Sequence, residues 1–119
     1  MSCLSPERLR TCFSDMEQYI LKTNPDGSTI TVRDVQMVLL EMMKDIDALC
    51  RKHDIPFFLN GGSALGAVRH QGFIPWDDDI DISMMLPDYR RFQSIAHELG
   101  DQYIVHCFET DKRYNVLIP

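Results

Sequence analysis

The chain has 119 residues, of which 45% are hydrophobic and 25% are charged, and its formal net charge is −6. This length allows one small domain with a real core, and the acidic balance disfavours nucleic-acid binding, for which a basic face is expected. No apolar run approaches the roughly 18 residues that would span a bilayer, and the N-terminus lacks the apolar stretch of a secretory signal.

The first half of the chain is predicted to be helical on either side of a turn. Residues 1–22 carry apolar side chains at helical spacing, and residues 24–28 have the composition of a turn or short linker. Thr31 or Asp34 can cap a long helix that reaches Lys52. Its apolar stripe comprises Val35, Val38, Leu39, Met42, Ile46 and Leu49.

The second half alternates short strands and helices. The predicted elements are a strand at 55–59, a helix at 63–70, a strand at 79–84, a helix from Pro87 to Gly100, and strands at 103–108 and 114–118.

This order indicates an α/β or α+β domain, with a small mixed sheet flanked by helices. Residues 1–30 would form an N-terminal helix and linker, and residues 31–119 the core. Because the chain ends inside the last predicted strand, we expect this core to be incomplete at its C-terminus.

The four cysteines are scattered and form no Cys-x-x-Cys pair. In a chain without an export signal we expect reduced thiols and a cytoplasmic protein, which could also lie peripherally at the inner face of the membrane. Cys50 and His53 could share a helical face, but a zinc site would need a second ligand pair, so this interpretation is not favoured.

The clearest chemical signal is the acidic run from Asp77 to Asp81. Side chains two residues apart in a strand share a face, so Asp79 and Asp81 would point the same way. Two neighbouring carboxylates repel each other unless a cation lies between them, and hard divalent ions prefer oxygen ligands. We therefore predict that Asp79 and Asp81 bind Mg²⁺ or Mn²⁺ and are catalytic. Asp77 and Asp78 are interpreted as capping and solvating the preceding loop.

The spacing of the acids also imitates the start of an EF-hand calcium loop. That loop requires Gly at its sixth position and Glu at its twelfth, where this chain has Ile82 and Asp88. The calcium interpretation fails.

A glycine-rich turn, Gly61-Gly62-Ser63, precedes the predicted helix at 63–70. Unpaired N–H groups and the helix dipole at such a position favour a phosphate. Ser63 can cap the helix, contact the phosphate, or do both.

Three further side chains near the turn leave alternatives open. Arg69 could contact the phosphate or form a surface salt bridge. His70 could act as a base or a phosphate contact, although a structural donor is favoured. Trp76 is interpreted as core, or as packing that aims the acidic strand, rather than as a platform for a nucleobase.

Two stretches resemble the LicD family strongly: residues 62–70, GSALGAVRH, and residues 72–82, GFIPWDDDIDI. This family includes phosphocholine transferases and fukutin-type transferases, and belongs to the nucleotidyltransferase-fold superfamily. The resemblance covers about residues 33–119. Ala64 departs from the family pattern, in which a larger aliphatic side chain is common, and family members are usually about twice as long.

The resemblance implies transfer of a phospho-substituent, typically phosphocholine from CDP-choline, onto a sugar of a surface glycan with a divalent metal. It places Gly62 and Ser63 at the donor phosphates, and Asp79 and Asp81 at the metal. A third metal-side carboxylate is common in the superfamily, and Glu109 or Asp111 could supply it here.

Two rival functions remain open. A nucleotide-sugar glycosyltransferase also uses Asp-x-Asp, but it requires a longer nucleotide-binding half before the acids than this chain has. A truncated, non-catalytic module that binds nucleotide and metal is the other alternative.

Overall fold

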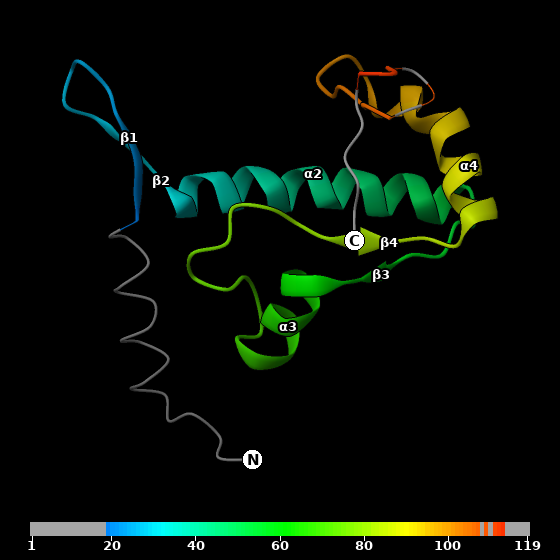
Figure 1. The fold of residues 1–119 in the computed structure, drawn as a ribbon, viewed down its shortest axis with the longest axis horizontal. Helices are drawn as coiled ribbons and strands as arrows, with labels where there is room; N and C mark the ends of the chain where they lie inside the picture. Colours follow the sequence, from blue (N-terminus) through cyan, green and yellow to red (C-terminus); the bar gives the residue numbers. More distant parts are fainter. Residues whose placement is uncertain (1–18, 108, 110, 114–119) are drawn as a thin grey trace.

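A computed structural model describes residues 19–107, 109 and 111–113 of the chain (Figure 1). Helices and short strands alternate along these residues, which confirms the mixed class expected from the sequence. The strands form two separate two-stranded antiparallel sheets, β1–β2 and β3–β4, in place of one mixed sheet. In the described part of the chain, no helix is both long enough and apolar enough to cross a membrane.

A hairpin of β1 (Ile20–Thr23) and β2 (Thr29–Thr31) precedes the first long helix. The turn predicted at 24–28 is confirmed: Gly27 has φ 86°, and Asp26 Oδ1 accepts hydrogen bonds from both the backbone N–H and the hydroxyl of Ser28. The helix predicted for residues 1–22 is wrong at its end, where β1 pairs with the threonine-rich β2. Its first eighteen residues lie outside the described part.

Helix α2 (Val32–Lys52) begins and ends close to its predicted limits. The Thr31 hydroxyl accepts from the Asp34 amide, while the Asp34 carboxylate accepts from the Thr31 amide, which is a complete capping box. The predicted apolar stripe is partly wrong, because Val38 is 69% exposed. The buried positions of α2 are Val32, Gln36, Leu49 and Cys50.

The central pair of strands, β3 (Phe58–Leu59) and β4 (Ile82–Ser83), is shorter than predicted. Pro56 has no N–H to donate, which helps explain why β3 starts late. On the other side, the Asn60 amide donates to the Asp81 carbonyl at 2.9 Å, so the pairing reaches Asp81. The strand predicted at 79–84 is therefore reduced to Ile82–Ser83, and both Asp79 and Asp81 lie outside it.

Two further helices complete the described fold. Helix α3 (Gly61–Arg69) follows β3, and α4 (Leu86–Ile95) continues into the 3-10 turn η2 (Ala96–Leu99), which stops before Gly100 as predicted. No strand forms at residues 103–107, and the strand predicted at 114–118 lies outside the described residues. Each described sheet therefore has only two, antiparallel strands, whereas the predicted mixed sheet would need at least three.

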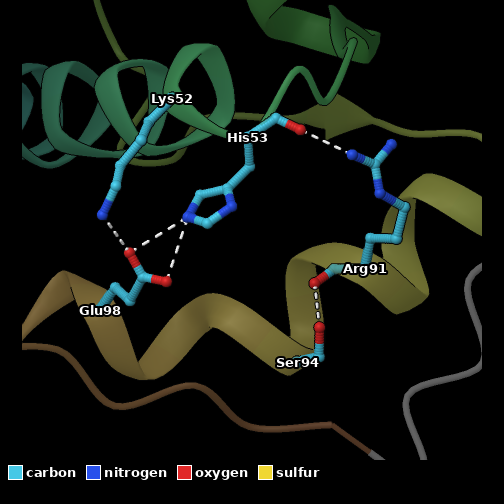
Figure 2. A network of polar contacts seen from close by, with 5 residues as sticks. All are labelled: Lys52, His53, Arg91, Ser94 and Glu98. Atoms are coloured by element: carbon cyan, nitrogen blue, oxygen red, sulfur yellow. Dashed lines mark hydrogen bonds and ion pairs between the residues drawn. The ribbon is translucent and has the colours of Figure 1, made fainter.

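Polar contacts join the C-terminal end of α2 to α4 and η2 (Figure 2). Glu98 accepts from Lys52 Nζ at 2.6 Å and lies 3.1 Å from His53 Nε2. Arg91 Nη2 donates to the His53 carbonyl at 2.6 Å, beyond the last turn of α2. The Arg91 contact satisfies a carbonyl at the end of α2, and the contacts of Glu98 hold η2 beside α2.

Candidate active site

The start of α3 is capped by Asn60, which the sequence reasoning overlooked. Asn60 Oδ1 accepts from the Gly61 amide at 2.9 Å. Ser63, which was expected to cap the helix, instead accepts a hydrogen bond through Oγ from the Asp81 amide at 2.8 Å. An asparagine directly before two glycines is a typical N-cap signal and could have been recognised. The serine therefore ties the glycine turn to the acidic segment (residues 77–81).

Two carboxylates lie directly against the two glycines of this turn. A Cβ on residue 61 would be 2.8 Å from Asp81 Oδ2, and a Cβ on residue 62 would be 2.7 Å from Asp77 Oδ2. Gly61 also has φ +49°, a left-handed conformation that side chains disfavour. Glycine at both positions is what lets the acidic segment approach the first turn of α3.

Asp79 is exposed, yet its ionisation is opposed by its surroundings. Desolvation, followed by the charges of Asp81, Asp77 and Asp78, raises the pKa of Asp79 above its ordinary value. Like charges concentrated at one place favour either a bound proton or a bound cation. The segment thus has the electrostatics that a divalent ion would relieve.

The protein groups available to such an ion are carboxylates. Among the described residues, no three His, Cys, Asp or Glu side chains are arranged as a metal-binding group. Two carboxylates, from Asp79 and Asp81, would still suit Mg²⁺, which commonly takes one or two from the protein and completes its shell with water and substrate phosphate. The residues present therefore fit a metal shared with a phosphate ligand, and the assignment to Asp79 and Asp81 stays a prediction.

The two candidates for a third carboxylate are engaged elsewhere. Glu109 accepts from Gln93 of α4 at 3.2 Å, and Asp111 pairs with the Arg113 guanidinium at 3.1 Å. Neither joins Asp79 and Asp81 in a group of three within the described structure.

Asp77 lies at the glycine turn, which the sequence did not predict. It was interpreted as a capping and solvating residue, but its half-buried carboxylate lies against Gly62. Asp78 is exposed, as a solvating residue would be.

Arg69 and His70 are not brought to the turn. They stand at the C-terminal end of α3, about 10 Å along the helix axis from Gly62 at 1.5 Å per residue. His70 is the C-cap of α3, and its Nδ1 is buried without a hydrogen-bond partner among the described residues. This geometry does not favour a direct contact of Arg69 or His70 with a phosphate at the glycine turn. Such a contact stays a prediction.

Trp76 is 59% exposed, so its interpretation as core is wrong. It occupies the third position of a turn in which the Asp77 amide donates to the Ile74 carbonyl at 3.0 Å. The other central residue of this turn, Pro75, is buried.

An apolar cavity of about 480 Å³ adjoins the turn and the acidic segment. Ser63 of α3 and Asp77 line it on the side of the site. The rest of its wall is mainly aliphatic and aromatic, with Leu40, Met43, Phe73 and Ile80 among the lining residues. A weakly hydrated group could therefore lie beside the carboxylates.

The cysteine near the end of α2 has the properties of a structural thiol. Cys50 is buried, and burial followed by the charge of Asp47 raises the pKa of its thiol. His53, its suggested zinc partner, contacts Glu98 instead.

Comparison with known proteins gives one family. Residues 54–115 match the family described as LicD/FKTN/FKRP, nucleotidyltransferase domain. The chain is 39% identical over 87 residues to the lipopolysaccharide cholinephosphotransferase LicD of Haemophilus influenzae, an alignment that covers 73% of this chain and 29% of that protein. It is 29% identical over 95 residues to the mouse ribitol-5-phosphate transferase FKTN, covering 78% of this chain and 19% of that protein.

A shorter match has higher identity. The human ribitol 5-phosphate transferase FKRP is 50% identical over 34 residues, which are 29% of this chain and 7% of that protein. The chain thus spans less than a third of the length of these relatives. No solved structure matches it. Because the matched region contains both the glycine turn and the acidic segment, and covers just over half of the chain, this protein belongs to the LicD family.

Proposed function

We propose that this chain performs, or contributes the phosphate-handling part of, a metal-dependent transfer of a phospho-substituent onto a sugar hydroxyl of a cell-surface glycan. The substituent we favour is phosphocholine, with CDP-choline as the donor. Support comes from family membership and from the relatives, which include a lipopolysaccharide cholinephosphotransferase and ribitol phosphate transferases.

One observation carries the proposal: two carboxylates lie over the N-terminal turn of a helix. The first amides of α3 have no intrahelical partner and favour an anion, but Asp77 and Asp81 lie against the same turn and would repel a bare phosphate. A phosphate that brings a divalent cation satisfies both, because the cation neutralises the carboxylates. This arrangement favours a metal-bound diphosphate over a simple anion.

In the proposed reaction, the sugar hydroxyl attacks the phosphorus that carries the choline ester. A new sugar O–P bond forms as the P–O bond to the cytidine monophosphate leaving group breaks, and the hydroxyl proton passes to a carboxylate of the acidic segment. When bound, Mg²⁺ or Mn²⁺ would supply neutralisation of phosphate charge in such a transfer.

The apolar cavity favours choline over ribitol as the transferred alcohol. A trimethylammonium group is weakly hydrated and is commonly recognised by aromatic faces and nearby carboxylates, which Phe73 and Asp77 offer. A ribitol chain carries hydroxyls that would find few partners on a wall of Leu40, Met43 and Ile80.

The proposal has one rival that the geometry also accommodates: a non-catalytic module that binds nucleotide and metal. A glycosyltransferase is not favoured, because the matched family is named for phospho-group transferases. The cytoplasmic location, with or without peripheral membrane contact, stays a prediction.

Calorimetry with CDP-choline, with and without Mg²⁺, tests the proposal, together with an assay for release of cytidine monophosphate in the presence of lipopolysaccharide. Cation-dependent binding with release supports the transferase, and a stronger response to CDP-choline than to the corresponding ribitol phosphate donor supports choline. Binding without release supports the module. Absence of cation-dependent nucleotide binding contradicts both.

A further inference from the structure

Gln36 is the only polar residue that is fully buried among the described residues, with 0% of its surface exposed. It lies one turn into α2, on the face that also buries Val32. A glutamine is seldom fully buried unless its amide is hydrogen-bonded, because burying an unpaired amide is costly. Its contacts therefore show what the side chain does.

Within the described structure, the hydrogen bonds of the Gln36 amide all go to one short turn. Nε2 donates to the carbonyls of Ile74 at 3.1 Å and Asp77 at 2.9 Å, with Pro75 O at 3.5 Å. These carbonyls belong to the turn closed by the Asp77 amide and the Ile74 carbonyl. The backbone on both sides of Trp76 is thus held to α2 by one side chain.

The segment that leads into this turn packs against α3. A Cβ on Gly66 would be 2.5 Å from the Gly72 carbonyl and 3.0 Å from the Ile74 amide, so the backbone of residues 72–74 passes directly over Gly66. The backbone of residues 72–74 is therefore in contact with Gly66, while the carbonyls of Ile74 and Asp77 bind Gln36. The acidic segment begins at Asp77, the last of these residues.

We propose that Gln36 is a positioning residue for the candidate active site. Its amide binds the Asp77 carbonyl while the Asp77 carboxylate lies against Gly62, so the position of that carboxylate is fixed from α2. The acidic segment is thus attached at both ends, to Gln36 through the Asp77 carbonyl and to Ser63 through the Asp81 amide. The inference that Gln36 holds the turn is independent of the proposed function. The inference that Gln36 affects metal binding rests on it.

The other atom of the amide supports this assignment. With Nε2 directed at the turn, Gln36 Oε1 is buried without a hydrogen-bond partner among the described residues. An aliphatic side chain would avoid this unpaired acceptor and would suit the apolar surroundings equally well. The hydrogen bonds that Nε2 donates to the turn are therefore the reason for an amide at this buried position.

The test compares Gln36→Met with Leu49→Ala in the full 119-residue chain. Methionine keeps the unbranched shape but has no N–H donor, whereas Leu49→Ala weakens the core at the far end of the same helix. Amide hydrogen exchange followed by NMR reports on the Asp77 amide, which closes the turn. After correction for global stability, we expect that amide to exchange about tenfold faster in Gln36→Met than in Leu49→Ala.

A second readout is the affinity for Mn²⁺, followed by the electron paramagnetic resonance of the free ion. We expect it to fall about tenfold in Gln36→Met and to be unchanged in Leu49→Ala, because only the first variant frees the acidic segment. If Gln36→Met does not fold, Gln36→Glu, whose neutral carboxyl retains one donor, is measured in the same way, with an intermediate effect expected.

Equal exchange of the Asp77 amide in the Gln36 variant and in Leu49→Ala would overturn the inference. If the unaltered chain binds no Mn²⁺, the metal-dependent function fails, while the exchange comparison still decides the role of Gln36.

Discussion

The carboxylate of Asp77 occupies the space that a side chain on Gly62 would need: Asp77 Oδ2 is 2.7 Å from the position of a Cβ there. The obstructing atom is the end of a flexible side chain, so an alanine could be accommodated if the carboxylate moved. Gly62 therefore matters for where the carboxylate lies more than for whether the helix forms.

Gly62→Ala is expected to change the free energy of unfolding by less than about 1 kcal/mol, since a helix gains up to that much from replacing glycine by alanine. The affinity for Mn²⁺ should fall, because Asp77 is displaced. Chemical denaturation and Mn²⁺ titration measure the two quantities. In an Asp77→Ala background the same substitution should leave Mn²⁺ affinity unchanged, and an equal loss in both backgrounds would contradict the proposed displacement.

Gly66→Ala should be much more harmful to the fold. Its Cβ would meet the Gly72 carbonyl at 2.5 Å and the Ile74 amide at 3.0 Å, and backbone atoms cannot move aside cheaply. We expect a loss on the order of 3 kcal/mol in the free energy of unfolding, at the upper end of the cost of overpacking. Gly72→Ala is the matched control, because a Cβ there has nothing within 4 Å. Similar stabilities of the two variants would be inconsistent with the packing described.

Asp79→Asn and Asp81→Asn test the metal assignment through stability. Desolvation and then the neighbouring carboxylates raise the pKa of Asp79, so without a cation its contribution to stability is lost as the pH rises through that raised pKa. Asp79→Asn should therefore be at least as stable as the unaltered chain at neutral pH. Addition of Mg²⁺ should raise the melting temperature of the unaltered chain and have little effect on either variant.

Asp101→Asn is a suitable control for those variants, because Asp101 is exposed and follows η2, outside the acidic segment. A Mg²⁺-induced stabilisation that survives in both Asp79→Asn and Asp81→Asn would rule out these residues as the metal ligands.

Glu98 should make the stability of the protein depend on acid pH. Hydrogen bonds from Lys52 and then His53 lower the pKa of Glu98 from 4.5 to about 2. A lowered pKa contributes stability that is present above the unfolded value, 4.5, and is lost as the pH falls towards about 2. Glu98→Gln should therefore be less stable than the unaltered chain above pH 4.5, with the difference shrinking as the pH falls through this range.

Thermal melts between pH 2 and pH 6 check this expectation. Glu41→Gln provides the comparison, since Glu41 is exposed and pairs with Lys44 at i+3 on the surface of α2. A pH-independent difference between Glu98→Gln and the unaltered chain would show that the lowered pKa does not contribute.

The helices were predictable because their limits are determined by local chemistry. Thr31 and Asp34 form a capping box, Pro87 lies in the first turn of α4, and Gly100 follows η2, each of which a sequence pattern reveals. The strands were less predictable, because pairing depends on partners distant in the chain. Residues 103–107 have the composition of a strand but no partner strand in the described fold.

The sequence was enough to predict which residues belong to the candidate site, but not which of them contact one another. The glycine turn and the acidic segment can be recognised from spacing, whereas the approach of Asp77 to Gly62 depends on the turn at 74–77 and on Gln36. A glutamine on an otherwise apolar helical face was the available signal. The predicted apolar face of α2 wrongly included Val38, because an aliphatic side chain at helical spacing can still be exposed.

Helix α2 is tied at both ends to different parts of the molecule, to the acidic segment through Gln36 and to η2 through Lys52 and His53. These two attachments are separated by about 24 Å of continuous helix. A rotation of α2 about its axis would have to disturb one attachment or the other. The acidic segment and η2 are therefore held to one another through a single continuous helix.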